Sequence, residues 1–285
     1  MVNRDISIKD MNTDIKLIEE LIRESKGCLP QGTIYLLSGY LRLILENKSV
    51  PEDFMVILPD GKIMLIPTSQ LPEAWLNILH VYCYKDYVLD HEFLPKPYWT
   101  VLDLGAYIGT YTLFSSSLMG LKGTIVSIEP NPYALKYLKR NLRINELEFM
   151  VKILPYAISN YDGEGTLYIT EYWAVSSIKK DYPLRFRYRV KELPVRVMKL
   201  STLLNSLELR NIDLMKIDVE GAESEIIEEL QRIIHRIHIG RIVVEVHRGL
   251  SDAMILTSTL RRLGYDVFLR DLGLKHQYFI FAVRI

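Results

Sequence analysis

Short apolar runs and helix-length segments alternate along the middle of this chain. Residues 101–104 and 124–128 form two apolar runs of strand length. Between them lie a turn containing Gly105 and Gly109 and the segment 108–119, which is long enough for a helix. This order of strand, glycine turn, helix and strand is typical of a parallel βαβ unit in a doubly wound sheet.

The same alternation continues to the end of the chain. Asn131 and Pro132 form a helix start, in which a polar N-cap precedes proline at the first helical position. Two final runs, at 265–269 and 278–283, predict an antiparallel pair at the sheet edge. Further predicted elements are strands at 149–154, 212–217 and 242–246, a loop at 156–158, a hairpin at 163–170 and a helix at 251–263.

The N-terminal part has a different pattern and no recognisable chemistry. Residues 1 to about 50 have helical spacing, and the runs 54–58 and 62–66 flank the turn triplet Pro59-Asp60-Gly61, which predicts a hairpin. We therefore expect a helical and hairpin extension at 1–95. Residues 96–285 would form the main domain, an α/β doubly wound, Rossmann-like sheet.

Composition adds limits but no function. Acidic and basic residues balance, so net charge gives no general argument for a nucleic-acid partner. Cys28 and Cys83 match no metal or disulfide spacing, and a reduced, cytoplasmic setting is the default expectation. The chain start lacks the apolar core of a signal peptide, and we expect no transmembrane segment.

Two carboxylates at predicted strand ends indicate a cofactor. Asp103 and Glu129 fall at the carboxyl ends of neighbouring strands, where doubly wound sheets bind ligands. Glu129 lies 20 residues after Gly109, a spacing that suits an acidic residue on a ribose hydroxyl. S-adenosylmethionine combines an adenosine with a cationic amino-acid end and carries no phosphate, so it fits both carboxylates.

A nicotinamide-dependent oxidoreductase on the same fold is the alternative from another enzyme class. The turn reads G-A-Y-I-G rather than G-x-G-x-x-G, and Asp103 would repel a pyrophosphate at the helix start. A methyltransferase-like binding module without catalysis is a third hypothesis. The presence of Asp103, Glu129, Asp218 and His247 counts against that loss.

Four segments together resemble a known family. The runs VLDLGAYIGTYTL, SIEPNP, LMKIDVEGAE and VVEVH, in this order, are similar to the FkbM-type family of S-adenosylmethionine-dependent methyltransferases, over roughly residues 85–247. The resemblance implies a seven-stranded class I methyltransferase sheet with an antiparallel edge strand. It also implies methyl transfer, mostly to hydroxyl oxygens of sugars or other small molecules.

The resemblance assigns residues to both halves of such a site. The residues implied for the cofactor are Asp103, Gly105, Ala106, Gly109, Glu129, Asn131 and Ala157. The residues implied for the acceptor and catalysis are Asp218, Glu220, Glu245 and His247.

The chemistry of methylating an alcohol requires a base. His247 is the natural candidate, because its reference pKa lies near 6.5, and Glu245 or Glu220 could orient it. A structural hydrogen bond for His247 and a helix-start position for Glu220 are the simpler alternatives. A divalent metal on Asp218, Glu220 and Glu245 is conceivable, but without a tight spacing motif we expect none.

A cationic segment suggests the nature of the acceptor. If residues 185–191 are extended, Arg185, Arg187, Arg189 and Lys191 share one face. Arginine pairs with phosphate and carboxylate, so this face predicts an anionic acceptor such as a phosphate-linked sugar. An RNA acceptor is a further alternative, and a solvated strand face or a subunit contact is the simpler interpretation; the oligomeric state stays open.

Overall fold

The computed structural model describes residues 8–185, 188–273 and 277–285. The chain divides into two compact units, Met1–Lys85 and Asp86–Ile285. Residues 86–95, which the sequence pattern grouped with the extension, contribute Tyr87 and Phe93 to the second unit, where they pack on Phe279 and Phe281. In the described part of the chain, no helix is long and apolar enough to cross a membrane.

The first unit combines helices with one hairpin, as its sequence pattern predicts. The turn around Gly61 joins the antiparallel strands β1 and β2, and Phe54 and Trp75 make an edge-to-face contact in the core of the unit. Its elements are α1 (Ile8–Ser25), α2 (Gln31–Leu45), β1 (Asp53–Ile57), β2 (Ile63–Pro67), η1 (Thr68–Gln70), α3 (Leu71–Ile78) and η2 (Leu79–Tyr84).

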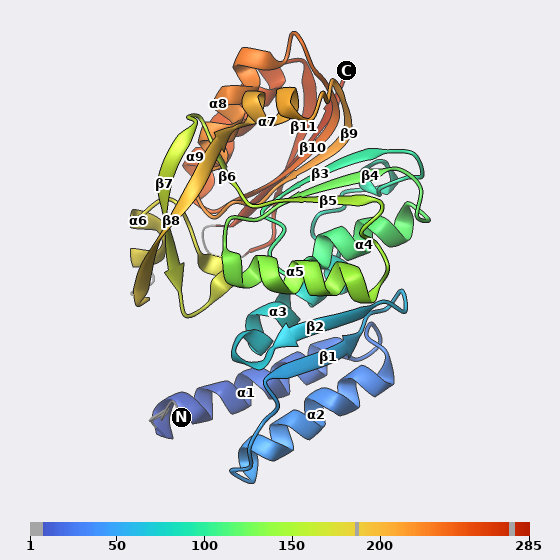
Figure 1. Ribbon diagram of the computed structural model, residues 1–285, viewed down its shortest axis with the longest axis vertical. Coiled ribbons are helices and arrows are strands. Elements are labelled where there is room, and N and C mark those ends of the chain that lie inside the picture. Colours follow the sequence, from blue (N-terminus) through green and yellow to red (C-terminus); the bar gives the residue numbers. More distant parts are fainter. Residues whose placement is uncertain (1–7, 186–187, 274–276) are drawn as a thin grey trace. The chain divides into compact units, whose positions relative to one another are not determined.

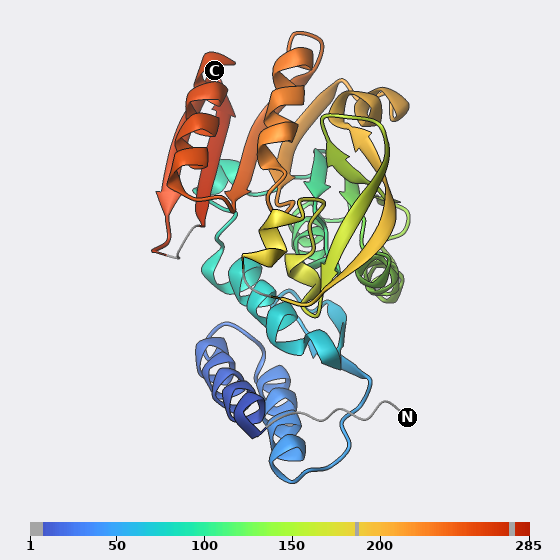
Figure 2. The same ribbon diagram turned by 90° about the vertical axis from the view of Figure 1, so that its left-hand side faces the viewer.

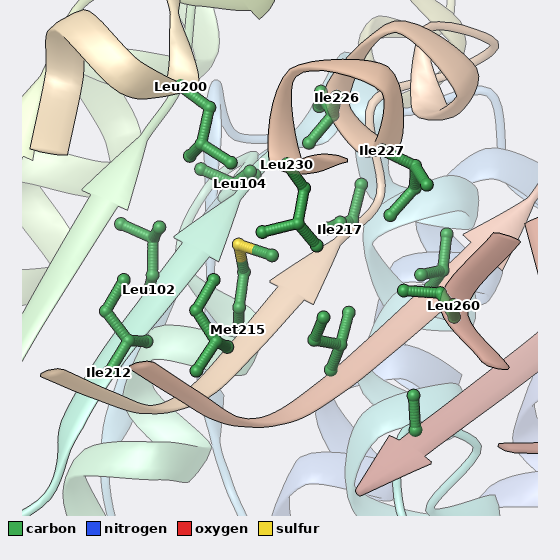
Figure 3. Packing of buried hydrophobic residues seen from close by; sticks show 14 of the residues in the cluster. Leu102, Leu104, Leu200, Ile212, Met215, Ile217, Ile226, Ile227, Leu230 and Leu260 are labelled. Carbon is green, nitrogen blue, oxygen red and sulfur yellow. The ribbon is translucent and has the colours of Figure 1, made fainter. Parts of the chain in front are cut away.

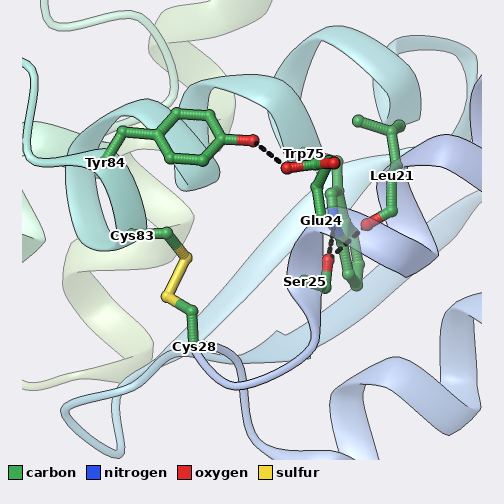
Figure 4. The surroundings of a disulfide bond; sticks show 7 residues. All are labelled: Leu21, Glu24, Ser25, Cys28, Trp75, Cys83 and Tyr84. Carbon is green, nitrogen blue, oxygen red and sulfur yellow. Dashed lines mark hydrogen bonds between the residues drawn. A yellow bond between two sulfur atoms is a disulfide. The ribbon is translucent and has the colours of Figure 1, made fainter.

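A disulfide joins Cys28 to Cys83 within this unit, so the expectation that these cysteines are unpaired is wrong (Figure 4). Their Cα atoms lie 5.6 Å apart although 55 residues separate them in sequence. Trp75 donates to the Ser25 hydroxyl at 2.8 Å beside the bond. Because disulfides are typical of oxidising compartments, the pairing removes the observation on which a reducing, cytoplasmic setting was expected.

The second unit is built on a seven-stranded sheet with the order β11-β12-β10-β9-β3-β4-β5 (Figure 1). The predicted doubly wound, class I methyltransferase architecture is therefore confirmed. The strands are β3 (Thr100–Leu104), β4 (Thr124–Ile128), β5 (Val151–Leu154), β9 (Asn211–Ile217), β10 (His238–Val246), β11 (Tyr265–Asp271) and β12 (Tyr278–Arg284). The helices around it are η3 (His91–Phe93), α4 (Thr110–Leu118), α5 (Pro132–Ile144), α7 (Leu200–Ser206), α8 (Glu223–Ile233) and α9 (Leu250–Arg262).

The antiparallel strand is β12, and it lies one position in from the edge. It pairs with β10 on one side and with β11 on the other, so β11 forms the edge. Residues 279–282 are all buried, which suits an interior strand, whereas buried and exposed residues alternate at the start of β11. Figure 2 shows α9 lying along this pair of strands.

Apolar side chains from strands and helices form the core of the second unit (Figure 3). Leu102 and Leu104 of β3 and Met215 and Ile217 of β9 are fully buried, and Leu230 of α8 packs against them. Burying a leucine or isoleucine side chain stabilises a fold by roughly 1.5–3 kcal/mol. This core fixes the ends of β3 and β9 beside each other.

An insertion between β5 and α7 forms a second, three-stranded sheet with the order β6-β8-β7. The predicted hairpin at 163–170 is wrong, because β7 pairs antiparallel with the distant β8 instead. The predicted loop at 156–158 is also wrong at its end, because Ala157 begins β6. The elements of the insertion are β6 (Ala157–Ser159), β7 (Gly163–Thr170), η4 (Trp173–Val175), α6 (Asp181–Leu184) and β8 (Val190–Lys199).

Candidate active site

The glycine turn after β3 touches the end of β9. Gly105 has a φ of +81°, and a Cβ at this position would lie 1.7 Å from the Asp218 carbonyl oxygen. The backbone N–H groups of Gly105 and Ala106 both donate to the Ile128 carbonyl at 3.0 Å. Gly109 has a φ of +101° and is the N-cap of α4. The backbone geometry thus requires glycine at position 105, where β3, β4 and β9 end side by side.

Asp103 lies beneath this turn rather than in the open. It is fully buried, and its Oδ2 accepts a hydrogen bond of 2.7 Å from the Thr112 hydroxyl. Its Oδ1 lies 3.2 Å from the Lys216 ammonium. Both carboxylate oxygens therefore face groups of the chain itself.

Lys216 links the two halves of the site, and the sequence pattern did not single it out. Its Nζ donates to the Gly105 carbonyl at 2.8 Å and lies 3.2 Å from Oδ2 of Asp218 as well as from Asp103. Burial opposes the charge, but Asp103 and Asp218 outweigh it and raise the pKa of Lys216. A lysine inside the apolar run of β9 is the sequence signal that could have found it, because a buried charge needs a partner.

Glu129 and Asn131 occupy the end of β4. The two carboxylate oxygens of Glu129 accept backbone N–H groups from Tyr107 and Asn131, each at 2.8 Å. Burial raises the pKa of Glu129 to about 7, and those hydrogen bonds partly offset the rise. Asn131 caps α5 as predicted, since its Oδ1 accepts from Tyr133 N, while its buried Nδ2 has no hydrogen-bond partner among the described residues. Ala157 is buried at the start of β6.

Of the four residues predicted for the acceptor side, the three carboxylates meet around the ring of the fourth, His247. His247 is 3% exposed, and its Nε2 lies 3.5 Å from Glu220 Oε1, 3.5 Å from Glu245 Oε1 and 3.6 Å from Asp218 Oδ1. We call Asp218, Glu220, Glu245 and His247 the His247 cluster. Asp218 and Glu220 follow β9, Glu245 lies near the end of β10, and His247 comes directly after β10. The adjacent ends of these two strands bring the four residues together.

Glu223 orients the ring from the other side, which the sequence pattern did not predict. Its Oε1 lies 2.8 Å from Nδ1 of His247 and also accepts the Gly221 N–H at 2.8 Å. Glu223 is 1% exposed. Glu223 is the first residue of α8, and nothing local in the sequence indicates its contact with the histidine that follows β10.

The electrostatics of the cluster are dominated by negative charge. Burial disfavours the imidazolium, yet Glu220, Glu223 and Glu245 outweigh it and raise the pKa of His247 well above its usual value. Burial also raises the pKa of Glu220 to about 8, with Asp218 and Glu245 adding to the rise. Burial would raise the pKa of Asp218 too, but the charges of Lys216 and His247 outweigh it and lower that pKa.

Tyr87 closes the cluster from the start of the second unit. Its hydroxyl lies 2.9 Å from Oδ2 of Asp218 and 2.5 Å from Oε2 of Glu245. One hydroxyl proton serves two carboxylates, so it can hold only one of them at a time. Burial and the two neighbouring carboxylates raise the pKa of Tyr87 well above its usual value.

The insertion holds Glu220 in an unusual backbone conformation. Glu220 has a φ of +55° and Gly221 a φ of +98°. The Ser177 hydroxyl donates to the Glu220 carbonyl, and the Tyr182 ring meets His247 edge-to-face with centroids 5.7 Å apart. Left-handed non-glycine residues are uncommon and concentrate at functional sites.

The predicted cationic strand face is wrong at Arg185, which lies in a helical turn. Arg185 follows the short helix α6 and pairs with Asp181 at 3.6 Å, and β8 begins only at Val190. Lys191 donates to the Tyr133 hydroxyl at 2.9 Å, Arg189 is exposed, and Arg187 lies outside the described residues. The helical turn that starts at Asp181 removes Arg185 from the alternation on which an anionic acceptor was predicted.

The chain is similar to known methyltransferases. A family model described as Methyltransferase FkbM domain matches residues 103–267. Methyltransferase 1 of Beauveria bassiana is 25% identical over 181 residues, covering 59% of this chain and 72% of that protein. Methyltransferase sdnD of Sordaria araneosa is 27% identical over 218 residues, covering 65% of this chain and 82% of that protein. The crystal structure of methyltransferase FkbM from Methylobacillus flagellatus KT has a TM-score of 0.48 and 14% identity; the match covers 96% of this chain and 60% of that one.

Proposed function

The chain belongs to the FkbM methyltransferase family, and we propose that it transfers a methyl group from S-adenosylmethionine to a hydroxyl oxygen of a glycan or small metabolite. The observation that carries this proposal is the position of the His247 cluster. Asp218 lies at the end of β9. Its carbonyl oxygen occupies the space that a Cβ at Gly105 would fill, and its carboxylate faces His247. A cofactor at the glycine turn and an acceptor at the cluster would therefore be neighbours.

The donor side has groups suited to S-adenosylmethionine. Glu129 keeps acceptor capacity for ribose hydroxyls, because a carboxylate oxygen has two lone pairs and each oxygen of Glu129 accepts one backbone N–H. The buried Nδ2 of Asn131 is a donor in need of an acceptor, which a ring nitrogen of adenine offers. Asp103 acts indirectly, because its carboxylate holds Lys216 beneath the turn.

The acceptor side has groups suited to an alcohol. Methyl transfer forms a carbon–oxygen bond as the carbon–sulfur bond of the sulfonium breaks, and the hydroxyl proton must pass to a base. The three carboxylates of the His247 cluster lie around the imidazolium of His247 within one small space and provide that base. The product pair is a methyl ether and S-adenosylhomocysteine.

The proposal is tested by label transfer from methyl-labelled S-adenosylmethionine to a panel of sugars, phosphosugars, hydroxylated metabolites and RNA. His247→Ala should lower the rate ~10²–10⁴-fold, the usual contribution of positioned acid–base groups, and leave cofactor affinity nearly unchanged. Glu228→Gln, an exposed change on α8, is the matched control and should keep the parental rate.

Two results would overturn the proposal. One is micromolar binding of NAD with no calorimetric response to S-adenosylhomocysteine, which would favour the oxidoreductase. The other is label found on nitrogen or carbon of the product rather than on oxygen. A parental rate in His247→Ala would leave the reaction standing but remove His247 from it.

A further inference from the structure

The His247 cluster is arranged as a set of metal ligands. One donor atom from each of Asp218, Glu220 and His247 lies within 4.8 Å of the others. A divalent cation with ligands at about 2.0–2.4 Å needs donor atoms about 2.8–4.8 Å apart, from adjacent to opposite positions. We propose that Asp218, Glu220 and His247 bind one divalent cation.

The Glu223 contact is an independent observation in favour of this site. Metal-binding histidines usually donate their other ring N–H to a carboxylate, which fixes the tautomer and the ring orientation. Here the buried Glu223 accepts from Nδ1 at 2.8 Å, so Nε2 points at the three carboxylates and offers its lone pair once a cation displaces its proton. Those oxygens lie 3.5–3.6 Å from Nε2, beyond normal hydrogen-bond length, and a cation between them satisfies both sides.

The charge of the surroundings favours a cation. Five carboxylates are joined in one chain of contacts that contains only two basic groups among the described residues, Lys216 and His247. The carboxylates belong to Asp103, Asp218, Glu220, Glu223 and Glu245, and their side chains are 0–18% exposed. Such partly buried negative charge is costly unless it is paired or binds a metal.

The ligand set selects the kind of ion. Two carboxylates and one imidazole suit Mn²⁺ or Mg²⁺ better than the thiolate-preferring metals. Glu245 stays outside the three ligands, and its Oε2 is held by Tyr87. The other carboxylate oxygen of Glu245, Oε1, is therefore available to accept a proton.

This site would also refine the chemistry, a step that rests on the proposed function. An acceptor hydroxyl bound to the cation has a lowered pKa, so its proton passes to Glu245 as the oxygen attacks the methyl carbon. In this arrangement His247 is a ligand and Glu245 is the base. Binding of the cation itself does not depend on the identity of the acceptor.

The test is Mn²⁺ binding to the full chain after chelator treatment, followed by electron paramagnetic resonance. We expect one site per chain, displaced by excess Mg²⁺. Glu223→Gln, which removes only the carboxylate behind the ring, should weaken Mn²⁺ binding ~10–100-fold. Glu220→Gln, at the partly exposed side, should weaken it at least about tenfold, and Glu228→Gln should bind like the parent.

The absence of stoichiometric Mn²⁺ binding would overturn the proposal, as would equal binding by Glu223→Gln, Glu220→Gln and Glu228→Gln. Circular dichroism and S-adenosylhomocysteine affinity show that each variant is folded. If Mn²⁺ binds as expected but no acceptor hydroxyl is ever methylated, the metal site stands and the proposed function fails. If methyl transfer persists in chelated protein that binds no Mn²⁺, the proposed function stands and the metal site fails.

Discussion

Glu129 is a carboxylate whose protonation should control cofactor binding. Burial raises its pKa to about 7, so it is mostly ionised at pH 8 and mostly protonated at pH 6. A ribose hydroxyl donates to the ionised form. The affinity for S-adenosylhomocysteine should therefore fall about tenfold from pH 8 to pH 6, in proportion to the ionised fraction.

Calorimetry across this pH range checks the prediction for Glu129. Glu129→Gln should bind more weakly at pH 8 and lose the dependence, and any titration of the ligand itself would persist in that variant. Glu228→Gln, an exposed change on α8, should retain the parental dependence. An affinity that is constant from pH 6 to pH 8 in the parental chain would contradict the role assigned to Glu129.

The turn between β3 and α4 is the element that places the cofactor side against β9. Gly105→Ala combines a left-handed φ with a Cβ that would lie 1.7 Å from the Asp218 carbonyl oxygen. The left-handed conformation costs about 1–2 kcal/mol, and displacement of packed backbone adds about 1–3 kcal/mol. The variant should lose stability and cofactor affinity together.

Gly120→Ala is the matched control for this turn. Gly120 also has a positive φ, of +59°, but a Cβ at this position would point into open space, with no neighbouring atom within 4 Å. Urea unfolding should show a loss of about 1–2 kcal/mol in Gly120→Ala with unchanged cofactor affinity. Equal losses of unfolding free energy in the two variants would mean that the close approach of Gly105 to β9 does not affect stability.

At the scale of the whole molecule, the disulfide constrains only the first unit. It closes a loop with a sequence separation of 55, which in the chain-entropy description stabilises the folded state by about 4 kcal/mol. In the double variant Cys28→Ser, Cys83→Ser, residues 8–85 should exchange amide hydrogens faster. Residues of the second unit should keep the parental rate.

Hydrogen exchange resolved by peptide measures both units in one sample. Reduction of the parental chain should reproduce the effect of the double variant, and reductant should leave the double variant unchanged. If reduction changes no exchange rate in residues 8–85, the two cysteines are not paired in solution.

The sequence by itself determined the doubly wound sheet of the second unit and the methyltransferase family of the chain. Apolar runs ending at Asp103 and Glu129 predicted strands whose carboxyl ends form one crevice, because strand burial and glycine turns are local properties. Its family resemblance predicted a methyltransferase, and the family match confirms this.

Tertiary structure alone decided which side chains meet. Tyr87 reaches Asp218 across 131 residues, Glu223 reaches His247 from another element, and Cys28 reaches Cys83. Contacts between distant segments leave no periodicity in the chain, since their energy comes from packing and charge that exist only after folding. The same reason explains why β7 paired with β8 rather than forming a local hairpin, and why a helical turn replaced the expected strand at Arg185.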